Sequence, residues 1–150
     1  MQVFIPYPEP IKVAECLDKK RLLSQVREAK QIIAAIEGTS TAWRNHPVVK
    51  MYQLHKKWLE CYKNTLELYS KGFVESAKLA SDEARVFRPI WLNEKLCITH
   101  RRRLYKKNPT HYETFAKWGF SDLNFYVVDN QVLVYQNGKV IHTESLINYV

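Results

Sequence analysis

Apolar residues recur every three or four positions through two long stretches of this chain, and this spacing constrains the fold more than any other feature. The first stretch runs from about Ile11 to Glu37, with the stripe Leu22, Val26, Ala29, Ile33 and Ile36. The second runs from about Pro47 to Gly72, with the stripe Val48, Tyr52, His55, Leu59, Tyr62, Leu66 and Tyr69. Stripes of this period are typical of helices that bury one face. We therefore expect a mainly α protein.

The C-terminal part of the chain changes character. Residues 74–85 and 91–107 each predict a further helix, and Asn108–Pro109 ends the second one. β-branched and aromatic residues then fill three segments, 125–128, 131–135 and 139–142. Asn137–Gly138 is typical of a two-residue hairpin turn. We expect a compact single-domain helical bundle over residues 1–120, with an appended β-hairpin or meander over residues 121–150 packed on the same domain.

Composition narrows the class of protein. The 150 residues are 46% hydrophobic, which is enough to bury a sizeable core. The first apolar run stops at Pro6, so we expect no secretion signal, and no apolar stretch approaches the ~20 residues of a membrane-spanning helix. The three cysteines are widely spaced and form no CxxC pair, which indicates reduced thiols. We expect a cytoplasmic monomer with no membrane association.

The positive charge is unevenly distributed. The net charge is +8, but residues 1–107 hold 21 basic and 11 acidic side chains, whereas residues 108–150 hold two and four. A localised excess of Lys and Arg is the electrostatic pattern of a nucleic-acid-binding protein. An anionic membrane would attract the same charge, but no strongly basic amphipathic anchor helix is evident. Nucleic acid is therefore the expected partner.

One carboxylate stands out on the first predicted helix. At helical spacing, Arg21, Ser24, Gln25 and Glu28 fall on one flank, beside the apolar stripe. Glu28 is then either a solvated ion-pair partner of Arg21 or Lys20, or a catalytic acid beside a bound polyanion. Partial burial next to cations would make its proton affinity tunable, which favours the catalytic interpretation.

Two other clusters point to phosphate. A basic run follows His100 and consists of Arg101, Arg102, Arg103, Lys106 and Lys107. The nearest acids are Glu94 and Glu113, so local pairing is not expected to neutralise the run, and phosphate contact is preferred to a merely solvated face. Arg44, Asn45 and His46 precede Pro47, where Asn45 or His46 either caps the next helix or contributes to an anion site.

Metal and nucleotide chemistry lack sequence support. The five histidines show no HxH, HExxH or Cys/His ligand spacing, and His55 is expected to be a core histidine. Four glycines form no phosphate-binding loop. We expect no metal and no cofactor.

Four blocks, taken in order, resemble the pyrimidine-dimer DNA glycosylase/AP lyase family. They are Leu17–Ala29, Trp43–Pro47, Lys71–Phe73 and Thr99–Gly119. The resemblance covers roughly residues 1–119. It implies a helical bundle with the N-terminal segment threaded between helices, and a double-stranded DNA substrate.

The resemblance also implies a mechanism. In this family the N-terminal α-amine attacks C1′ of the damaged nucleotide, expels the base and forms an imine, and β-elimination then cuts the strand. Glu28 matches the assisting glutamate, Arg27 a DNA-contacting arginine, and Arg21 a basic position. His46 and residues 99–107 match DNA-facing blocks. The nucleophile is the amine of Met1 or, after processing, of Gln2.

This chemistry suits the residues. An α-amine is less basic than a lysine side chain, so a fraction of it is neutral and nucleophilic near neutral pH. Two alternatives stay open, namely a non-catalytic DNA-binding protein of the same fold and a glycosylase retargeted to another modified base.

Overall fold

The computed structural model describes residues 1–149. Contacts group the chain into two units, residues 1–89 and residues 90–150. The boundary predicted at residue 120, between a family domain and an extension, stays a prediction.

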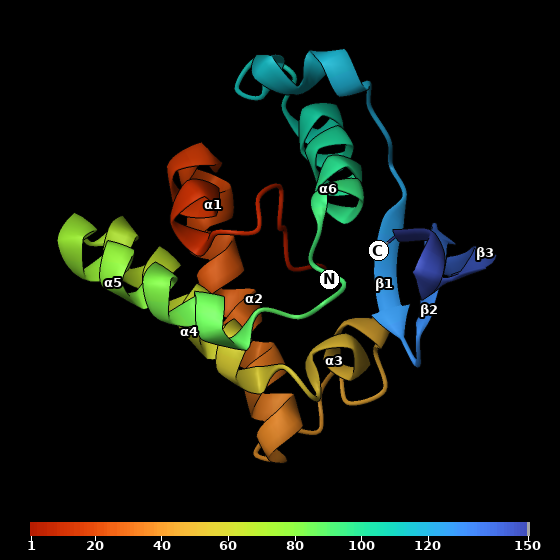
Figure 1. Cartoon of the computed structure of the whole chain (residues 1–150), viewed down its shortest axis with the longest axis horizontal. Helices are drawn as coiled ribbons and strands as arrows, with labels where there is room; N and C mark the ends of the chain where they lie inside the picture. The colour runs from red at the N-terminus through yellow and green to blue at the C-terminus, as the bar shows by residue number, and fades with distance from the viewer. Residues whose placement is uncertain (150) are drawn as a thin grey trace. The chain divides into compact units, whose positions relative to one another are not determined.

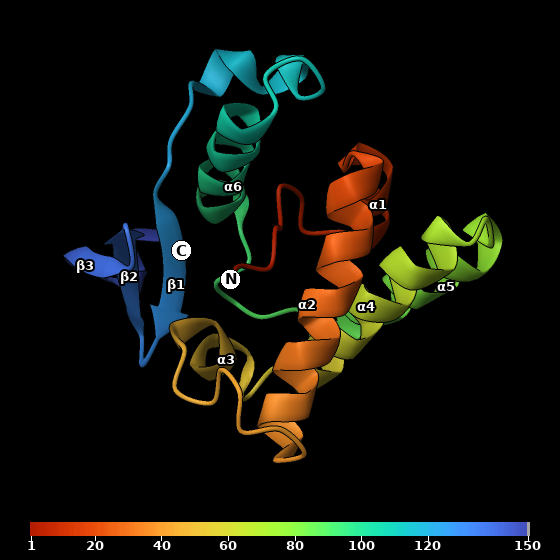
Figure 2. The ribbon, with the colours of Figure 1, turned by 180° about the vertical axis from the view of Figure 1, so that it is seen from behind.

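The first unit consists of helices that pack around α4. Its elements are α1 (Pro10–Cys16), α2 (Lys19–Glu37), α3 (Pro47–Tyr52), α4 (Lys56–Ser70), α5 (Val74–Ala84) and the 3₁₀ helix η1 (Arg85–Phe87). α4 packs against α1, α2 and α5, while α3 packs against α2. Figures 1 and 2 view the protein from opposite sides, and both show α2 and α4 crossing one another. The predicted helical bundle is confirmed for this unit.

Each of the two long predicted helices is broken once. The backbone of Leu17 and Asp18 is extended between α1 and α2, and residues 53–55 separate α3 from α4. An apolar stripe shows only which residues face the core. The helices on either side of each break face the same core, so the stripe continues across the break. His55 lies half-buried at the start of α4, so the prediction of a core histidine was wrong.

Aromatic side chains fill the centre of the first unit. The Trp58 ring stacks on Tyr52, with 6.0 Å between ring centroids, and tilts against Tyr62 at 5.3 Å. All three are almost fully buried. On α2 the inner face is shifted slightly from the predicted stripe, because Ile32 and Ala35 are buried whereas Ile33 and Ile36 are only half-buried.

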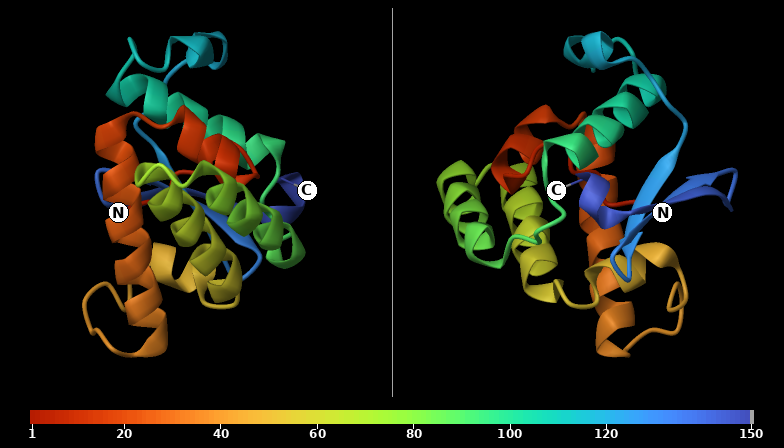
Figure 3. Two further views of the ribbon diagram at one scale, coloured as in Figure 1. Left: turned by 90° about the vertical axis from the view of Figure 1, so that its left-hand side faces the viewer. Right: turned by 45° about the vertical axis from the view of Figure 1, so that its right-hand side comes forward.

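The second unit joins a helix to an antiparallel sheet. Its elements are α6 (Glu94–Lys107), the 3₁₀ helix η2 (Glu113–Trp118), β1 (Asn124–Val128), β2 (Gln131–Gln136), β3 (Lys139–Ser145) and the 3₁₀ helix η3 (Leu146–Tyr149). The strand order is β1–β2–β3. Figure 1 labels the strands, and Figure 3 shows this part of the chain in blue from two further sides. α6 packs against η2 and β1. The predicted mainly α fold with a C-terminal β-meander is confirmed.

Local sequence explains the boundaries in this unit. The Asn93 side chain accepts a hydrogen bond from the Leu96 N–H, so α6 begins at Glu94, three residues after the predicted start. Asn137 and Gly138 both have positive φ, as a tight hairpin turn between twisted strands requires. The side chains of Tyr126, Val132 and Val134 are buried.

Two findings concern the expectations of reduced thiols and of no membrane-spanning helix. Cys16, Cys61 and Cys97 are free thiols. No helix within residues 1–149 combines the length and the apolar character needed to cross a bilayer.

Candidate active site

The N-terminal segment is built into the first unit. Pro6, Pro8 and Pro10 restrict the backbone of this segment and lead it into α1, where Pro10 is the first helical residue. Residues 2–6 are buried, and Met1 is half-buried. Figure 1 shows this segment in dark red, ahead of α1. The threading implied by the family resemblance is therefore present.

Hydrogen bonds fix the segment to α2 and α4. The Phe4 N–H donates to Gln25 Oε1 at 2.7 Å, and Gln25 Nε2 donates to the Gln2 carbonyl oxygen at 2.9 Å. The Tyr62 hydroxyl, from α4, donates to the Phe4 carbonyl oxygen at 2.8 Å. Gln25 is 2% exposed and Tyr62 fully buried, so these bonds lie away from water. Buried polar groups in proteins are almost always satisfied in this way.

Glu28 lies one helical turn after Gln25, beside the same segment. Its Oε2 accepts a hydrogen bond from Gln25 Nε2 at 2.9 Å. Burial raises the pKa of Glu28 above its ordinary value. The N-terminal amine, the Gln25 amide, the Gln2 backbone and Arg27 each oppose that rise by a smaller amount. The structure thus brings the N-terminus, Gln2 and Glu28 together.

His46 adjoins the same amine. Its Nδ1 accepts a hydrogen bond from the Val48 N–H at 3.1 Å, so the open choice of helix cap is resolved in favour of His46. Burial and, to a smaller extent, the charge of the N-terminal amine lower the pKa of His46. A neutral ring that accepts at Nδ1 carries its proton on Nε2 and can still donate a hydrogen bond there.

The loop before His46 is exposed. Arg44 and Asn45 both face solvent, and Trp43 is 48% exposed. The Trp43 ring contacts the His46 ring edge-on, with 5.6 Å between centroids. Trp43 also has a φ of 64°, a conformation that is rare for a bulky residue and occurs in turns and at functional sites.

The two arginines predicted on α2 take different positions. Arg21 forms an ion pair with Asp18 at 3.2 Å, and both side chains are mostly buried. Arg27 is exposed, with Nη2 at 3.5 Å from the Ser24 hydroxyl. Arg27 is therefore the more accessible of the two to a polyanion.

In the second unit, the basic run on α6 is partly engaged. Arg101 is buried, pairs with Glu94 two turns earlier at 2.6 Å, and lies 4.5 Å above the Trp118 ring. The Arg101–Glu94 pair itself was not predicted, although both side chains are long enough to span two turns, and it engages one cation of the run. Burial lowers the pKa of His100 to about 3, so this ring is neutral at physiological pH.

The other cations of the run are more accessible. Arg102 donates to the Trp118 carbonyl oxygen at 2.7 Å, and Arg103 donates to Asn124 Oδ1 at 3.1 Å. Arg102, Lys106 and Lys107 are exposed. These three retain the exposure that phosphate contact needs.

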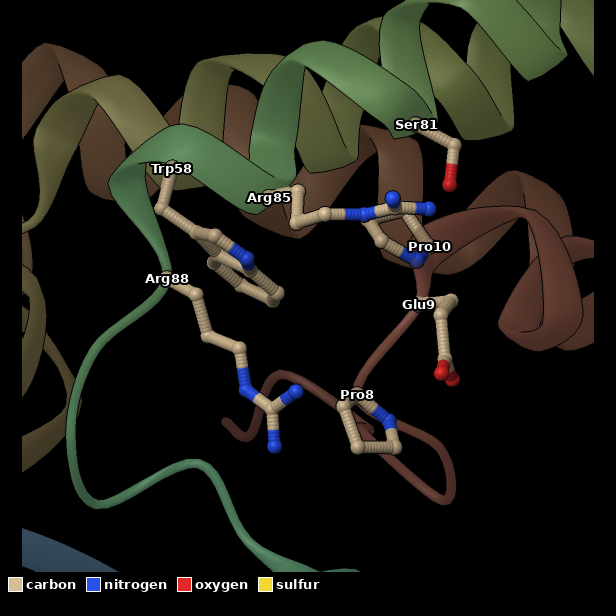
Figure 4. Close-up of a pocket in the computed structure, with 7 residues that line it drawn as sticks. All are labelled: Pro8, Glu9, Pro10, Trp58, Ser81, Arg85 and Arg88. Carbon is tan, nitrogen blue, oxygen red and sulfur yellow. The ribbon is translucent and has the colours of Figure 1, made fainter.

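A separate cavity of about 150 Å³ lies elsewhere in the first unit. In Figure 4, Trp58, Arg85 and Arg88 line one side of it, and Pro8, Glu9 and Pro10 line the other. Arg85 is also within 3.6 Å of Asp82. None of the predicted site residues lines this cavity.

The chemistry open to the Glu28 site follows from its groups. A primary amine and a carboxyl of raised pKa provide a nucleophile and a proton donor side by side.

Within residues 1–149, no three His, Cys, Asp or Glu side chains are grouped so that they could hold a metal ion.

Sequence reasoning missed two residues of the site. Tyr62 was assigned only to an apolar stripe, since nothing local indicates that its hydroxyl reaches a residue 58 positions away. Trp43 was named only within a motif, although a large aromatic residue in a polar, Pro-ended loop is a usable signal.

Comparison with known proteins agrees with this geometry. The family model described as pyrimidine dimer DNA glycosylase matches residues 1–79, just over half of the chain. The match includes the N-terminal segment, Glu28, His46 and Tyr62, whereas the block Thr99–Gly119 lies outside it. No curated protein and no solved structure matches the chain significantly.

Proposed function

The chain belongs to the pyrimidine dimer DNA glycosylase family, and we propose that it excises a pyrimidine dimer or related base lesion from double-stranded DNA and then acts as an AP lyase. The observation that carries this proposal is the position of Glu28. A carboxyl of raised pKa lies within electrostatic reach of the N-terminal amine and is hydrogen-bonded to the residue that fixes the N-terminal segment.

The first step exchanges the base for the amine. The amine nitrogen, of Met1 or of Gln2 after removal of Met1, forms a bond to C1′ of the damaged nucleotide and loses one of its protons. The bond from C1′ to the base nitrogen breaks, and the base leaves with the electron pair and takes up a proton. The C1′–O4′ bond then opens, O4′ takes up a proton, and the nitrogen and C1′ are left as a protonated imine.

The second step cuts the strand. A base removes a proton from C2′, and the electron pair of that C–H bond forms the C2′–C3′ double bond. The C3′–O bond breaks, and the 3′ phosphate leaves with its electron pair. Water then hydrolyses the imine and restores the free amine.

Glu28 has a role in each step. Its raised pKa keeps a larger protonated fraction near neutral pH, and this form donates a proton to O4′ or to the leaving base. The ionised form that results stabilises the positive charge on the imine and can accept the C2′ proton.

DNA contacts involve the exposed cations and the loop of residues 43–46. In the first unit, Arg27, Arg44, Asn45 and the His46 Nε2–H are the proposed contacts to DNA, with Arg21 supporting α2. The exposed Trp43 ring offers a surface on which an unpaired base can stack. In the second unit, the proposed contacts are Arg102, Arg103, Lys106 and Lys107, while the buried His100 and Arg101 require a rearrangement to reach DNA.

We further propose that the enzyme acts as a monomer in the cytoplasm, without a metal or cofactor. The free thiols are in keeping with a reducing compartment. A chelator should therefore leave strand cleavage unchanged.

The test uses an end-labelled duplex with a single cyclobutane thymine dimer, cleaved by wild-type, Glu28→Gln and Glu37→Gln proteins. Glu37 is an exposed carboxylate on the same helix and is the matched control. We expect Glu28→Gln to lose at least about a hundredfold in cleavage rate while retaining DNA binding, as loss of a general acid–base group predicts. Wild-type protein that binds the duplex without cleaving it would identify a DNA-binding protein, and cleavage of other lesions only would identify a retargeted glycosylase.

A further inference from the structure

The Gln25 amide has partners at both its oxygen and its nitrogen, and the single hydroxyl hydrogen of Tyr62 is shared between Gln25 Oε1 and the Phe4 carbonyl oxygen. Its Oε1 faces the Phe4 N–H at 2.7 Å and the Tyr62 hydroxyl at 3.0 Å, and its Nε2 faces the Gln2 carbonyl and Glu28 Oε2, both at 2.9 Å. Rotating the amide by 180° would oppose donor to donor at Phe4 and acceptor to acceptor at Gln2. The orientation of the amide is therefore fixed by its partners.

Tyr62 completes the attachment from α4. Its hydroxyl reaches the Phe4 carbonyl oxygen at 2.8 Å, so the backbone of Phe4 is held at both its N–H and its C=O. The Gln2 carbonyl is held by Gln25 on the same side. These bonds define one register, because a slip of one residue along the extended segment would exchange the bonded groups for those of Val3.

We propose that Gln25 and Tyr62 are positioning residues that keep the reacting amine beside Glu28. This inference rests on the amine chemistry proposed above. Gln25 contacts both the segment that carries the amine and the carboxyl that assists it, so it fixes their separation. A one-residue slip would move the amine by about 3.3 Å, and misplacement by only about 1 Å can cost a hundredfold in rate.

The test separates imine formation from lesion recognition by using a duplex with one abasic site. Borohydride reduction traps the imine under single-turnover conditions with excess protein. Gln25→Leu should slow trapping by about 10- to 100-fold, and Tyr62→Phe by about 3- to 10-fold. The dissociation constant for the duplex should not change. Gln31→Leu and Tyr69→Phe, on the same two helices, are the controls and should trap at the wild-type rate.

The pH dependence of imine trapping by the variant Gln25→Glu distinguishes a positioning role from a purely structural one. The ionised carboxylate would place an acceptor against the Gln2 carbonyl and against Glu28, whereas the neutral acid can donate one hydrogen bond. Other titratable or charged groups around the amine are Arg27 on α2, His46 before α3 and Tyr62 on α4. Trapping by Gln25→Glu, relative to wild type, should recover as the pH is lowered, and trapping by Gln25→Leu should not.

A second measurement follows the segment itself. The Phe4 amide should exchange with deuterium far faster in Gln25→Leu than in wild type, while thermal unfolding shows whether each variant remains folded. Wild-type trapping rates in both Gln25→Leu and Tyr62→Phe, or unchanged Phe4 exchange in Gln25→Leu, would overturn the positioning role. Wild-type protein that forms no adduct would overturn the proposed function instead, even if Phe4 exchange responds as expected.

Discussion

At the scale of single residues, the site depends on where Glu28 lies on its helix. It follows Gln25 by three positions, so the two side chains meet on one flank of α2, between the core and solvent. Burial of the carboxyl favours its neutral form, and the nearby amine favours its ionised form. The balance leaves the pKa raised, which suits a group that must both donate and accept protons.

A raised pKa also has a consequence for stability. Below the ordinary pKa of a glutamate, Glu28 is neutral in the folded and unfolded chains alike. As the pH rises, the unfolded chain ionises first, and stability is lost until the pH exceeds the raised pKa of the folded state. We therefore expect Glu28→Gln to melt a few degrees above wild type at pH 7 and at nearly the same temperature at pH 4.

Thermal denaturation at the two pH values measures this difference, with Glu37→Gln as the control. Equal melting temperatures of Glu28→Gln and wild type at pH 7 would mean that burial of Glu28 carries no such cost.

Helical spacing was enough to find Glu28 but not its surroundings. The flank of Arg21, Ser24, Gln25 and Glu28 was predicted, yet an amide on a flank gives no sign that it is buried and bonded to the N-terminal segment. Its partners Phe4 and Tyr62 are 21 and 37 positions away and meet it only in the folded chain.

At the scale of elements, the short helix α3 begins at a residue for which we propose two roles, as a helix cap and as a contact to DNA. His46 caps this helix with Nδ1, and Nε2 lies on the other side of the ring. The lowered pKa keeps the ring neutral near pH 7, so the cap persists in the state in which we propose that Nε2–H donates to DNA.

Two substitutions separate these roles of His46. Asn is also a good helix cap, so His46→Asn should melt close to wild type, while His46→Ala should melt about 2–4 °C lower because a cap contributes ~1 kcal/mol. Both should cleave dimer-containing duplex about tenfold more slowly, since each lacks the ring N–H. Wild-type cleavage by His46→Asn would show that His46 serves the helix alone.

The elements themselves were predicted to different degrees. The strand positions agree closely with the structure because Asn137–Gly138 specifies a turn locally. The breaks at Leu17–Asp18 and at residues 53–55 were not predicted, since the segments on both sides bury the same face. The Arg101–Glu94 pair was missed because spacing of seven residues exceeds the usual range of helical side-chain pairs.

At the scale of the whole molecule, both units carry excess positive charge. Residues 1–89 hold 15 basic and 10 acidic side chains, and residues 90–150 hold eight and five. Several of these cations already form ion pairs within their own unit, as Arg21 and Arg101 do. The cations that remain exposed are therefore the ones expected to release counterions when DNA binds.

Salt dependence tests this distribution. Neutralising Arg102, Lys106 and Lys107 together to alanine should reduce the slope of log K against log salt by about 2.7, at roughly 0.9 for each lost phosphate contact. The same triple change at Lys71, Lys78 and Lys139 is the control. Binding titrations between low and moderate salt give both slopes, and equal slopes would remove the α6 run from the DNA interface.

The central claim is that the N-terminal amine forms a covalent imine with the sugar of a damaged nucleotide. Borohydride trapping on a duplex with one cyclobutane thymine dimer, followed by intact-mass measurement and peptide mapping, tests it most directly. We expect one adduct per chain, on the α-nitrogen of Met1 or of Gln2. An adduct on a lysine side chain, or no adduct during strand cleavage, would contradict the mechanism.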